Sequence, residues 1–215
     1  MKAIPREAGR VTYSTKIRNL KKIKLTSFEK SVILGCILGD GCLCSNWSKT
    51  NYRLRTTQSI GQRDYIFWKY SVLKKLVLTK PRYYDKTKSL AFRTISHPEL
   101  TILRNIFYPN GKKIIPLNIK DFIKDPLTIA VWFMDDGNAS LRKRKLCGYN
   151  INSQSFTYDE NLLISKVLND LYSIECIVEK NHGKFRIAIY RQNSRETFKR
   201  LIEPYMLESM KYKLG

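Results

Sequence analysis

Acidic residues, histidines and long hydrophobic runs are all scarce in this sequence, and each shortage excludes a class of protein. The 215 residues include 18 Asp and Glu against 40 Lys and Arg, which gives a formal charge of +22. Such an excess of positive charge requires an anionic partner, and nucleic acid is the leading candidate. A bilayer span needs roughly 18 apolar residues, whereas the longest run, residues 31–39, suffices for one short helix. We therefore expect a nucleic-acid partner and no membrane contact.

Cysteine and histidine usage argues against sulfur-based or imidazole-based sites. The cysteines are odd in number and lack a C-x-x-C pair, so neither a disulfide framework nor a zinc site is expected among Cys36, Cys42, Cys44, Cys147 and Cys176. A histidine metal cage is also excluded, because the chain has only His97 and His182. Free thiols in a reducing compartment are the expected state.

The N-terminal region, residues 1–25, is a basic arm. It carries eight Lys and Arg against a single acidic residue, Glu7, and contains no hydrophobic core of a secretory signal. A transit peptide and a DNA-binding arm both fit this pattern.

The chain contains an internal repeat. The first copy opens with a capping-box pattern, Thr26 to Glu29, and continues as an apolar run that ends in Asp40-Gly41. The second opens with Asp125-Pro126, an N-cap followed by proline, and its apolar run ends in Asp136-Gly137. Gln58 and Gln154 each lie 18 residues after the motif Asp, and a late lysine follows at 73 residues (Lys113) or 77 residues (Lys213).

The repeat predicts an α+β protein made of two pseudo-symmetric αββαββα halves. We expect helices over residues 66–78 and 160–172, and strands over 51–59, 145–153 and around 92–93 and 185–186. The predicted organisation is a basic arm (1–25), a first half (26–116), a linker (117–125) and a second half (126–215).

The ends of the two apolar helices are where chemistry is expected. Helices that are apolar on every side are most economically buried against each other, which would bring Asp40 and Asp136 to one end of a shared seam. Each carboxylate would then face a like charge at the negative end of a helix dipole, so a cation must compensate. Hard oxygen ligands favour Mg²⁺. The alternative is that each Asp-Gly only stops its helix, with Gly41 and Gly137 in the left-handed conformation.

At these residues the sequence resembles the LAGLIDADG homing endonucleases, whose nine motif positions are occupied by residues 33–41 and 129–137. It is most similar to the two-motif, single-chain, intron-encoded enzymes of organelles, such as the omega-intron endonuclease, through residues 132–137, 154–157 and 212–214. Cys36 and Leu38 depart from the usual motif residues, which concerns packing rather than catalysis.

The resemblance implies a monomer that makes a double-strand break at a long, weakly palindromic DNA site and promotes intron mobility. The implied cofactor is two or three divalent cations, Mg²⁺ first, with Mn²⁺ or Ca²⁺ able to substitute for binding. The implied compartment is an organelle, a mitochondrion before a chloroplast, whose genome encodes the protein. The implied catalytic residues are Asp40, Asp136, Gln58, Gln154, Lys113 and Lys213, and the metal would be held by Asp40 and Asp136 with secondary roles for Gly39 and Asp135.

Two β-sheets would form a saddle whose outward side chains contact the major groove. Arg53 and Arg55 alternate with Leu54, so one face can pack on the core while the other reaches DNA. Further candidates in the first half are Tyr83, Lys86, Lys88 and Arg93. Those in the second half are Arg142 and Arg144 at an expected hairpin tip, with Asn150, Asn152, Lys180, His182, Lys184, Arg186 and Arg191.

Three other functions compete with the nuclease. An intron maturase, bound to its host intron RNA, or a non-catalytic DNA-binding regulator could use the same scaffold, and a basic ribosomal or RNA-chaperone protein fits the charge. The last leaves the duplicated Asp, Gln and Lys unexplained, and the intact Asp40 and Asp136 favour the nuclease.

We predict that DNA affinity falls steeply with salt, because bound lysines and arginines release condensed counterions. The slope of log K against log salt should be about −0.9 for each phosphate neutralised. A titration on duplex DNA measures it, and a slope near zero would contradict binding through the groove.

Overall fold

The computed structural model describes residues 14–46 and 50–215, and it contains two halves with the same order of elements. The first comprises α2 (Ser27–Leu38), β1 (Cys42–Ser45), β2 (Tyr52–Ser59), α3 (Arg63–Val72), β3 (Arg82–Tyr84), β4 (Ser89–Arg93) and α4 (Pro98–Phe107). The second comprises α5 (Pro126–Asp136), β5 (Gly137–Arg142), β6 (Lys145–Ile151), α6 (Tyr158–Tyr172), β7 (Ile177–Asn181), β8 (Lys184–Ile189) and α7 (Gln192–Ile202). The predicted α+β class and the αββαββα order are confirmed.

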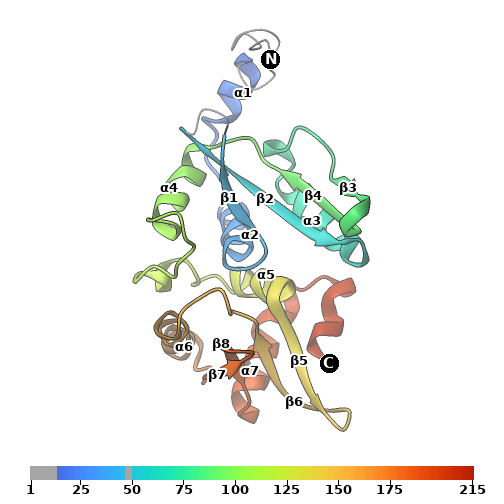
Figure 1. Ribbon diagram of the computed structural model, residues 1–215, viewed down its shortest axis with the longest axis vertical. Coiled ribbons are helices and arrows are strands. Elements are labelled where there is room, and N and C mark those ends of the chain that lie inside the picture. Colours follow the sequence, from blue (N-terminus) through green and yellow to red (C-terminus); the bar gives the residue numbers. More distant parts are fainter. Residues whose placement is uncertain (1–13, 47–49) are drawn as a thin grey trace.

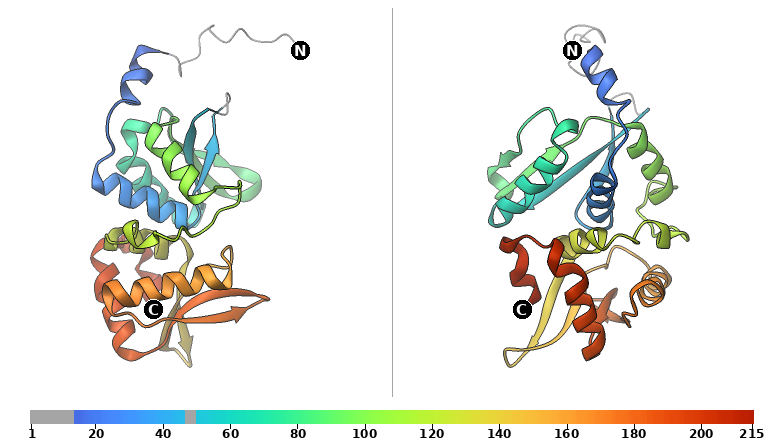
Figure 2. Two further views of the ribbon diagram at one scale, coloured as in Figure 1. Left: turned by 90° about the vertical axis from the view of Figure 1, so that its left-hand side faces the viewer. Right: turned by 180° about the vertical axis from the view of Figure 1, so that it is seen from behind.

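Each half contributes one four-stranded antiparallel sheet, with strand orders β1-β2-β4-β3 and β5-β6-β8-β7. The halves lie one above the other, and α2 and α5 meet between them (Figures 1 and 2). The core runs through both halves, since the buried residues of α2, α5 and both sheets belong to one cluster.

The two central helices begin where the sequence predicts. The Thr26 hydroxyl accepts the Glu29 backbone N–H, and Glu29 accepts the Thr26 backbone N–H in return. Asp125 caps α5 by accepting the Leu127 N–H, and proline follows at the first helical position. Pairing the orphan amides in this way fixes the starting residue of each helix.

The contact between α2 and α5 depends on glycine. A Cβ at Gly35 would lie 2.5 Å from Val131 Cβ and 2.7 Å from the Thr128 carbonyl oxygen, and one at Gly39 would lie 2.5 Å from Asp135 Cβ. These distances are shorter than any van der Waals contact, so the helix backbones approach each other only because these positions lack side chains. The predicted burial of each helix against the other is confirmed.

The glycines that follow the motif aspartates are not left-handed. Gly137 has φ −86°, and Gly41 is absent from the glycines with positive φ in the described residues. A Cβ at Gly41 would instead lie 2.6 Å from the Cys36 carbonyl oxygen, and one at Gly137 would enter the Phe133 ring. The alternative in which each Asp-Gly is only a left-handed helix stop is therefore wrong, and close packing is what requires glycine here.

Several boundaries differ from those expected. The helix predicted over residues 66–78 is α3 (Arg63–Val72) followed by a 3-10 turn, Lys74–Leu76. In the expected N-terminal arm, α1 (Thr15–Leu20) is capped by Ser14 and buries Ile17, while residues 1–13 lie outside the described residues. Nowhere in 14–46 and 50–215 is a helix long and apolar enough to cross a membrane.

We predict that Gly35→Ala destabilises the protein, although alanine normally favours a helix by about 1 kcal/mol over glycine. The added Cβ must force α2 and α5 apart, and overpacking of this kind costs about 1–3 kcal/mol. Denaturant unfolding measures the change in free energy.

Gly61→Ala is the matched control, because its Cβ would meet nothing closer than Ser59 Oγ at 3.8 Å. A Gly35→Ala protein as stable as wild type would show that the helices do not pack at this distance.

Candidate active site

Two carboxylates stand at the adjoining ends of α2 and α5. Asp40 follows the last turn of α2 and is exposed, and Asp136 is the last residue of α5 and is half-buried. Burial, together with the charges of Asp40 and Asp135, raises the pKa of Asp136 to about 7. Ionisation of Asp136 is thus opposed first by loss of water and then by the neighbouring carboxylates, and an adjacent cation would relieve both effects.

One lysine lies against each helix end. Lys113 Nζ donates to the carbonyl oxygens of Gly39 (2.9 Å) and Gly41 (3.2 Å), and Lys213 Nζ donates to those of Met134 (2.6 Å) and Asp135 (2.9 Å). Burial lowers the pKa of both lysines, although the neighbouring aspartates oppose this shift. The predicted late lysines are thus brought to equivalent places by the two halves.

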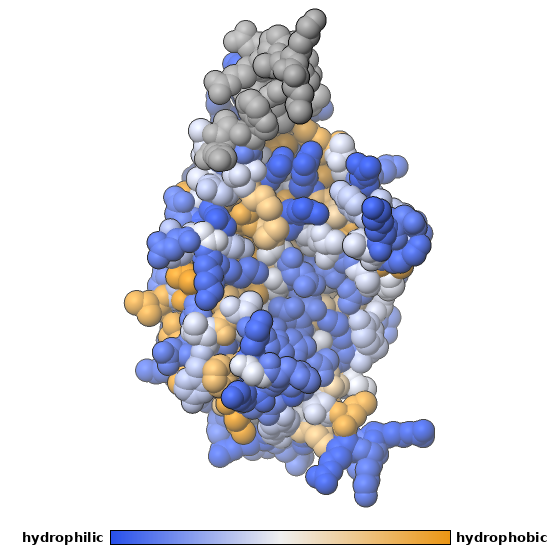
Figure 3. All heavy atoms as spheres, in the orientation of Figure 1, coloured by the Kyte–Doolittle hydropathy of each residue, from blue (hydrophilic) through white to orange (hydrophobic). Residues whose placement is uncertain are grey.

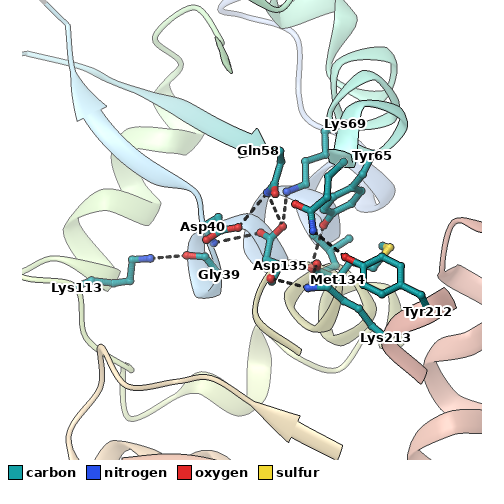
Figure 4. A network of polar contacts seen from close by, with 12 residues as sticks. Gly39, Asp40, Gln58, Tyr65, Lys69, Lys113, Met134, Asp135, Tyr212 and Lys213 are labelled. Carbon is teal, nitrogen blue, oxygen red and sulfur yellow. Dashed lines mark hydrogen bonds and ion pairs between the residues drawn. The ribbon is translucent and has the colours of Figure 1, made fainter. Parts of the chain in front are cut away.

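Asp135 lies at the centre of a hydrogen-bond network (Figure 4). Its Oδ1 accepts from Lys69 Nζ at 2.5 Å and from Gln58 Nε2 at 3.0 Å, and its Oδ2 accepts the Asp40 backbone N–H at 3.2 Å. Gln58 Nε2 also lies 3.1 Å from Asp40 Oδ2. Both carboxylate oxygens of Asp135 are therefore engaged by protein donors.

The second half does not reproduce this network. Gln154, which matches Gln58 in the repeat, donates to Asn181 Oδ1 at 3.3 Å and does not contact Asp136. Asn152 approaches instead, and its Nδ2 donates to the Asp136 carbonyl oxygen at 2.8 Å. The structure brings together Asp40, Gln58, Asp135, Asp136 and the two lysines, and it leaves Gln154 outside the hydrogen-bonded group.

Lys69 and Tyr65 are the site neighbours that sequence reasoning missed. Lys69 is fully buried, and its Nζ lies 4.0 Å from the centre of the Tyr65 ring. Burial opposes its charge, but the combined interactions with Asp135, Cys36 and Asp40 outweigh burial and raise the pKa of Lys69. One signal was present, because Lys69 stands between Ile66 and Leu73 at helical spacing, on the face that those residues bury.

The donors available for a metal are oxygen atoms alone. Among residues 14–46 and 50–215, no group of three or more His, Cys, Asp and Glu forms a ready-made metal cage. The Asp40 and Asp136 carboxylates, beside the carbonyl oxygens of the helix ends, are a donor set that suits a hard divalent cation. The raised pKa of Asp136 fits this assignment, since an adjacent cation would relieve the repulsion.

The face of the first sheet opposite the helices is basic. Along β2, Leu54, Thr56 and Gln58 are buried, whereas Arg55 is exposed. In the antiparallel register, Arg55 lies opposite Arg93 on the neighbouring strand β4. Burial and the charge of Arg93 lower the pKa of the adjacent Arg53. Arginines placed this close to one another favour an anionic partner.

Two hairpin tips extend the basic surface in the second half. Lys143 and Arg144, between β5 and β6, both have positive φ, as does the His182-Gly183 pair between β7 and β8. Two-residue turns with both φ positive match the twist of the strands they join, so the hairpin tip predicted near Arg142 is confirmed. In Figure 3 a hydrophilic cluster projects beyond the β5–β6 hairpin.

Some of the residues predicted to contact DNA are buried or paired with a carboxylate of the protein itself. Asn150 is 3% exposed, Arg186 is paired with Glu179 at 2.6 Å, and Arg191 is paired with Glu175. The exposed members of the predicted set are Arg55, Tyr83, Lys86, Lys88, Arg93, Arg142, Arg144, Lys180, His182, Lys184 and Arg191, of which Lys88 also forms a surface ion pair, with Asp85.

Comparison with known proteins agrees with this geometry. The DNA endonuclease I-ChuI of Chlamydomonas applanata is 28% identical over 90% of this chain and 97% of its own length. The structure of the homing endonuclease I-WcaI bound to its DNA recognition sequence aligns with a TM-score of 0.85 and 25% identity, over 97% of this chain and 96% of that one. I-DmoI, solved in complex with DNA and Mn, shares the fold at a TM-score of 0.52 and 17% identity, over 84% of this chain and 99% of that one.

Other curated relatives are longer. The Protein RecA of Mycolicibacterium flavescens is 28% identical over 97% of this chain, which spans 51% of that protein. The cytochrome b mRNA maturase bI2 of Saccharomyces cerevisiae is 28% identical over 86% of this chain, which spans 47% of that protein. The chain thus spans about half the length of these relatives. The model of the LAGLIDADG DNA endonuclease family matches residues 30–197, a segment that contains both nine-residue motifs, both sheets and Lys113. The chain belongs to the LAGLIDADG DNA endonuclease family.

Proposed function

We propose that this protein is a site-specific homing endonuclease that cuts both strands of a long, weakly palindromic DNA target. The observation that carries the proposal is the convergence of Asp40 and Asp136 at one end of the α2–α5 seam, with Lys113 and Lys213 each bound to the adjoining helix end. Metal-dependent phosphodiester hydrolysis needs both kinds of group close to the scissile phosphates.

Asp40 and Asp136 hold the divalent cations, for which Mg²⁺ is the proposed physiological ion and Mn²⁺ a substitute. When bound, the cations polarise the scissile phosphate and lower the pKa of water. Lys113 and Lys213 face the charge that develops on the phosphate. Gln58 orients Asp40. Its counterpart Gln154 can rearrange when DNA binds, since among residues 14–46 and 50–215 its side chain makes one hydrogen bond, to Asn181.

The DNA partner is recognised by the outward faces of the two sheets and their basic hairpin tips. Because one chain supplies both motif helices and both sheets, we propose that it acts as a monomer, on a target whose two halves differ in sequence. Intron mobility in an organellar genome is the proposed biological role, supported by the names of two relatives, a probable intron-encoded endonuclease of Wickerhamomyces canadensis and the cytochrome b mRNA maturase.

We predict that Asp40→Asn and Asp136→Asn each lower the rate of double-strand cleavage by more than ~100-fold. Loss of a residue that only hydrogen-bonds to a metal ligand typically costs about 10–100-fold, so loss of a ligand should cost more. The measurement is single-turnover cleavage of a duplex selected from a randomised library, in Mg²⁺ and at a salt concentration that permits binding. Asp121→Asn is the control, because this aspartate pairs with Lys124 on the surface, at 60% side-chain exposure.

Binding of the library by wild type without cutting, under every divalent cation tried, would overturn the nuclease assignment. A maturase or a non-catalytic regulator would then be the better description, and binding of the host intron RNA would separate these two.

We also predict that Mg²⁺ raises the melting temperature of the DNA-free protein, because a ligand that binds only the folded state stabilises it. At 100-fold above its Kd the cation contributes about 2.7 kcal/mol, which is roughly 5 °C or more for a chain of this size. The Asp40→Asn/Asp136→Asn double variant should lose the shift. An equal shift in that variant would place the bound cation elsewhere.

A further inference from the structure

A buried ion pair joins the two halves beside the motif helices. Lys69 of α3 and Asp135 of α5 are separated by 2.5 Å, and both side chains are 0% exposed. Removing two charges from water is costly, and their attraction compensates only where the geometry is good and further hydrogen bonds are made. Here the further bonds come from Gln58 and from the Asp40 backbone N–H, so the pair is linked directly to the candidate metal ligand.

The network orients Asp40 in two ways. The Asp135 Oδ2 atom accepts the Asp40 backbone N–H, and Gln58 Nε2 bridges Asp135 Oδ1 and Asp40 Oδ2 at 3.0 and 3.1 Å. Gln58 can make both contacts only while Asp135 keeps its position, and Lys69 is the partner that balances the Asp135 charge. Asp40 is therefore held before DNA binds, although its own side chain is exposed.

Asp136 has no equivalent support. The position that matches Asp135 in the first motif is Gly39, where even a Cβ would clash with Asp135. Within residues 14–46 and 50–215, the Asp136 carboxylate accepts no hydrogen bond, and Gln154 is turned toward Asn181. The two halves thus present one supported and one unsupported carboxylate.

We propose that Lys69 is a positioning residue that acts through Asp135 and Gln58 on Asp40, whereas the Asp136 carboxylate is not hydrogen-bonded to this network and is not positioned by it. The proposal rests on the proposed nuclease function and adds an asymmetry to it, because the two strands depend on different carboxylates. Loss of Lys69 slows cleavage of the strand served by Asp40 more than cleavage of the other strand.

The test is single-turnover cleavage of a duplex with a different label on each strand. In Lys69→Met, we expect one strand to slow by about 10–100-fold relative to the other, so that nicked DNA accumulates. Gln58→Ala should slow the same strand. Lys75→Met is the matched control, because Lys75 pairs with a carboxylate of the other motif helix, Glu29 of α2 at 2.8 Å, but lies outside the site.

Folding and positioning are separated by a second variant. Lys69→Met/Asp135→Asn removes both buried charges together, a change that is often neutral or stabilising for folding. The asparagine at position 135 has one side-chain oxygen and cannot accept the hydrogen bonds that the two oxygens of Asp135 accept. We expect this double variant to be as stable as wild type and to show the same slowing of one strand as Lys69→Met. Equal slowing of both strands in the folded variants, or the same bias in Lys75→Met, would overturn the proposal.

Mn²⁺ titration of the protein–DNA complex, followed by electron paramagnetic resonance, gives a readout that does not require cutting. Lys69→Met should weaken one class of Mn²⁺ site and leave another unchanged. If wild type cuts neither strand, the proposed function fails, and the titration still decides the role of Lys69, because unchanged Mn²⁺ binding would overturn it.

Discussion

The close approach of α2 and α5 is the constraint on which the rest of the structure depends. Without side chains at Gly35 and Gly39, the two backbones meet directly, and both helices end at the same place. The C-terminal ends of both helices then lie together, and each end carries unpaired carbonyl groups and the negative end of a helix dipole. Lys113 and Lys213 donate hydrogen bonds to those carbonyl groups, so the packing of the helices also determines where the two lysines lie.

The same convergence explains why a protein with a formal charge of +22 contains a locally acidic centre. Basic residues lie on the strands and hairpin tips, where phosphates approach from solvent, whereas Asp40, Asp135 and Asp136 lie at the seam. The proposed DNA-binding surface and the proposed cation site are thus separated in space. Screening by salt acts mainly on the exposed basic surface and much less on the buried seam.

Features encoded by neighbouring residues could be predicted from the sequence. The capping box of α2, the N-cap of α5, the apolar runs and the hairpin tip near Arg142 depend on contacts within a few residues, and the repeat related Asp40 to Asp136 without a structure. Contacts between distant residues could not be predicted. Lys69 meets Asp135 across 66 positions, and a lone lysine in a helix does not identify its partner.

The repeat also overstated the symmetry of the site. Gln154 occupies the position that Gln58 predicts, but Asn181 in the second half offers it another acceptor. Asn150 and Arg186 lie on the expected strands, but Asn150 is buried and Arg186 forms an ion pair with Glu179. A pattern in one sequence places residues on a strand but does not reveal their neighbours on adjacent strands.

Neither half can serve as its own partner. Two copies of the first half would set Gly39 against Gly39 and leave two buried Lys69 side chains without a carboxylate. Two copies of the second half would force two Asp135 side chains into the space that one of them now fills. Divergence of the duplicated sequence has therefore made the pairing irreversible, and any exchange of halves between related enzymes must carry Gly39, Lys69 and Asp135 as a matched set.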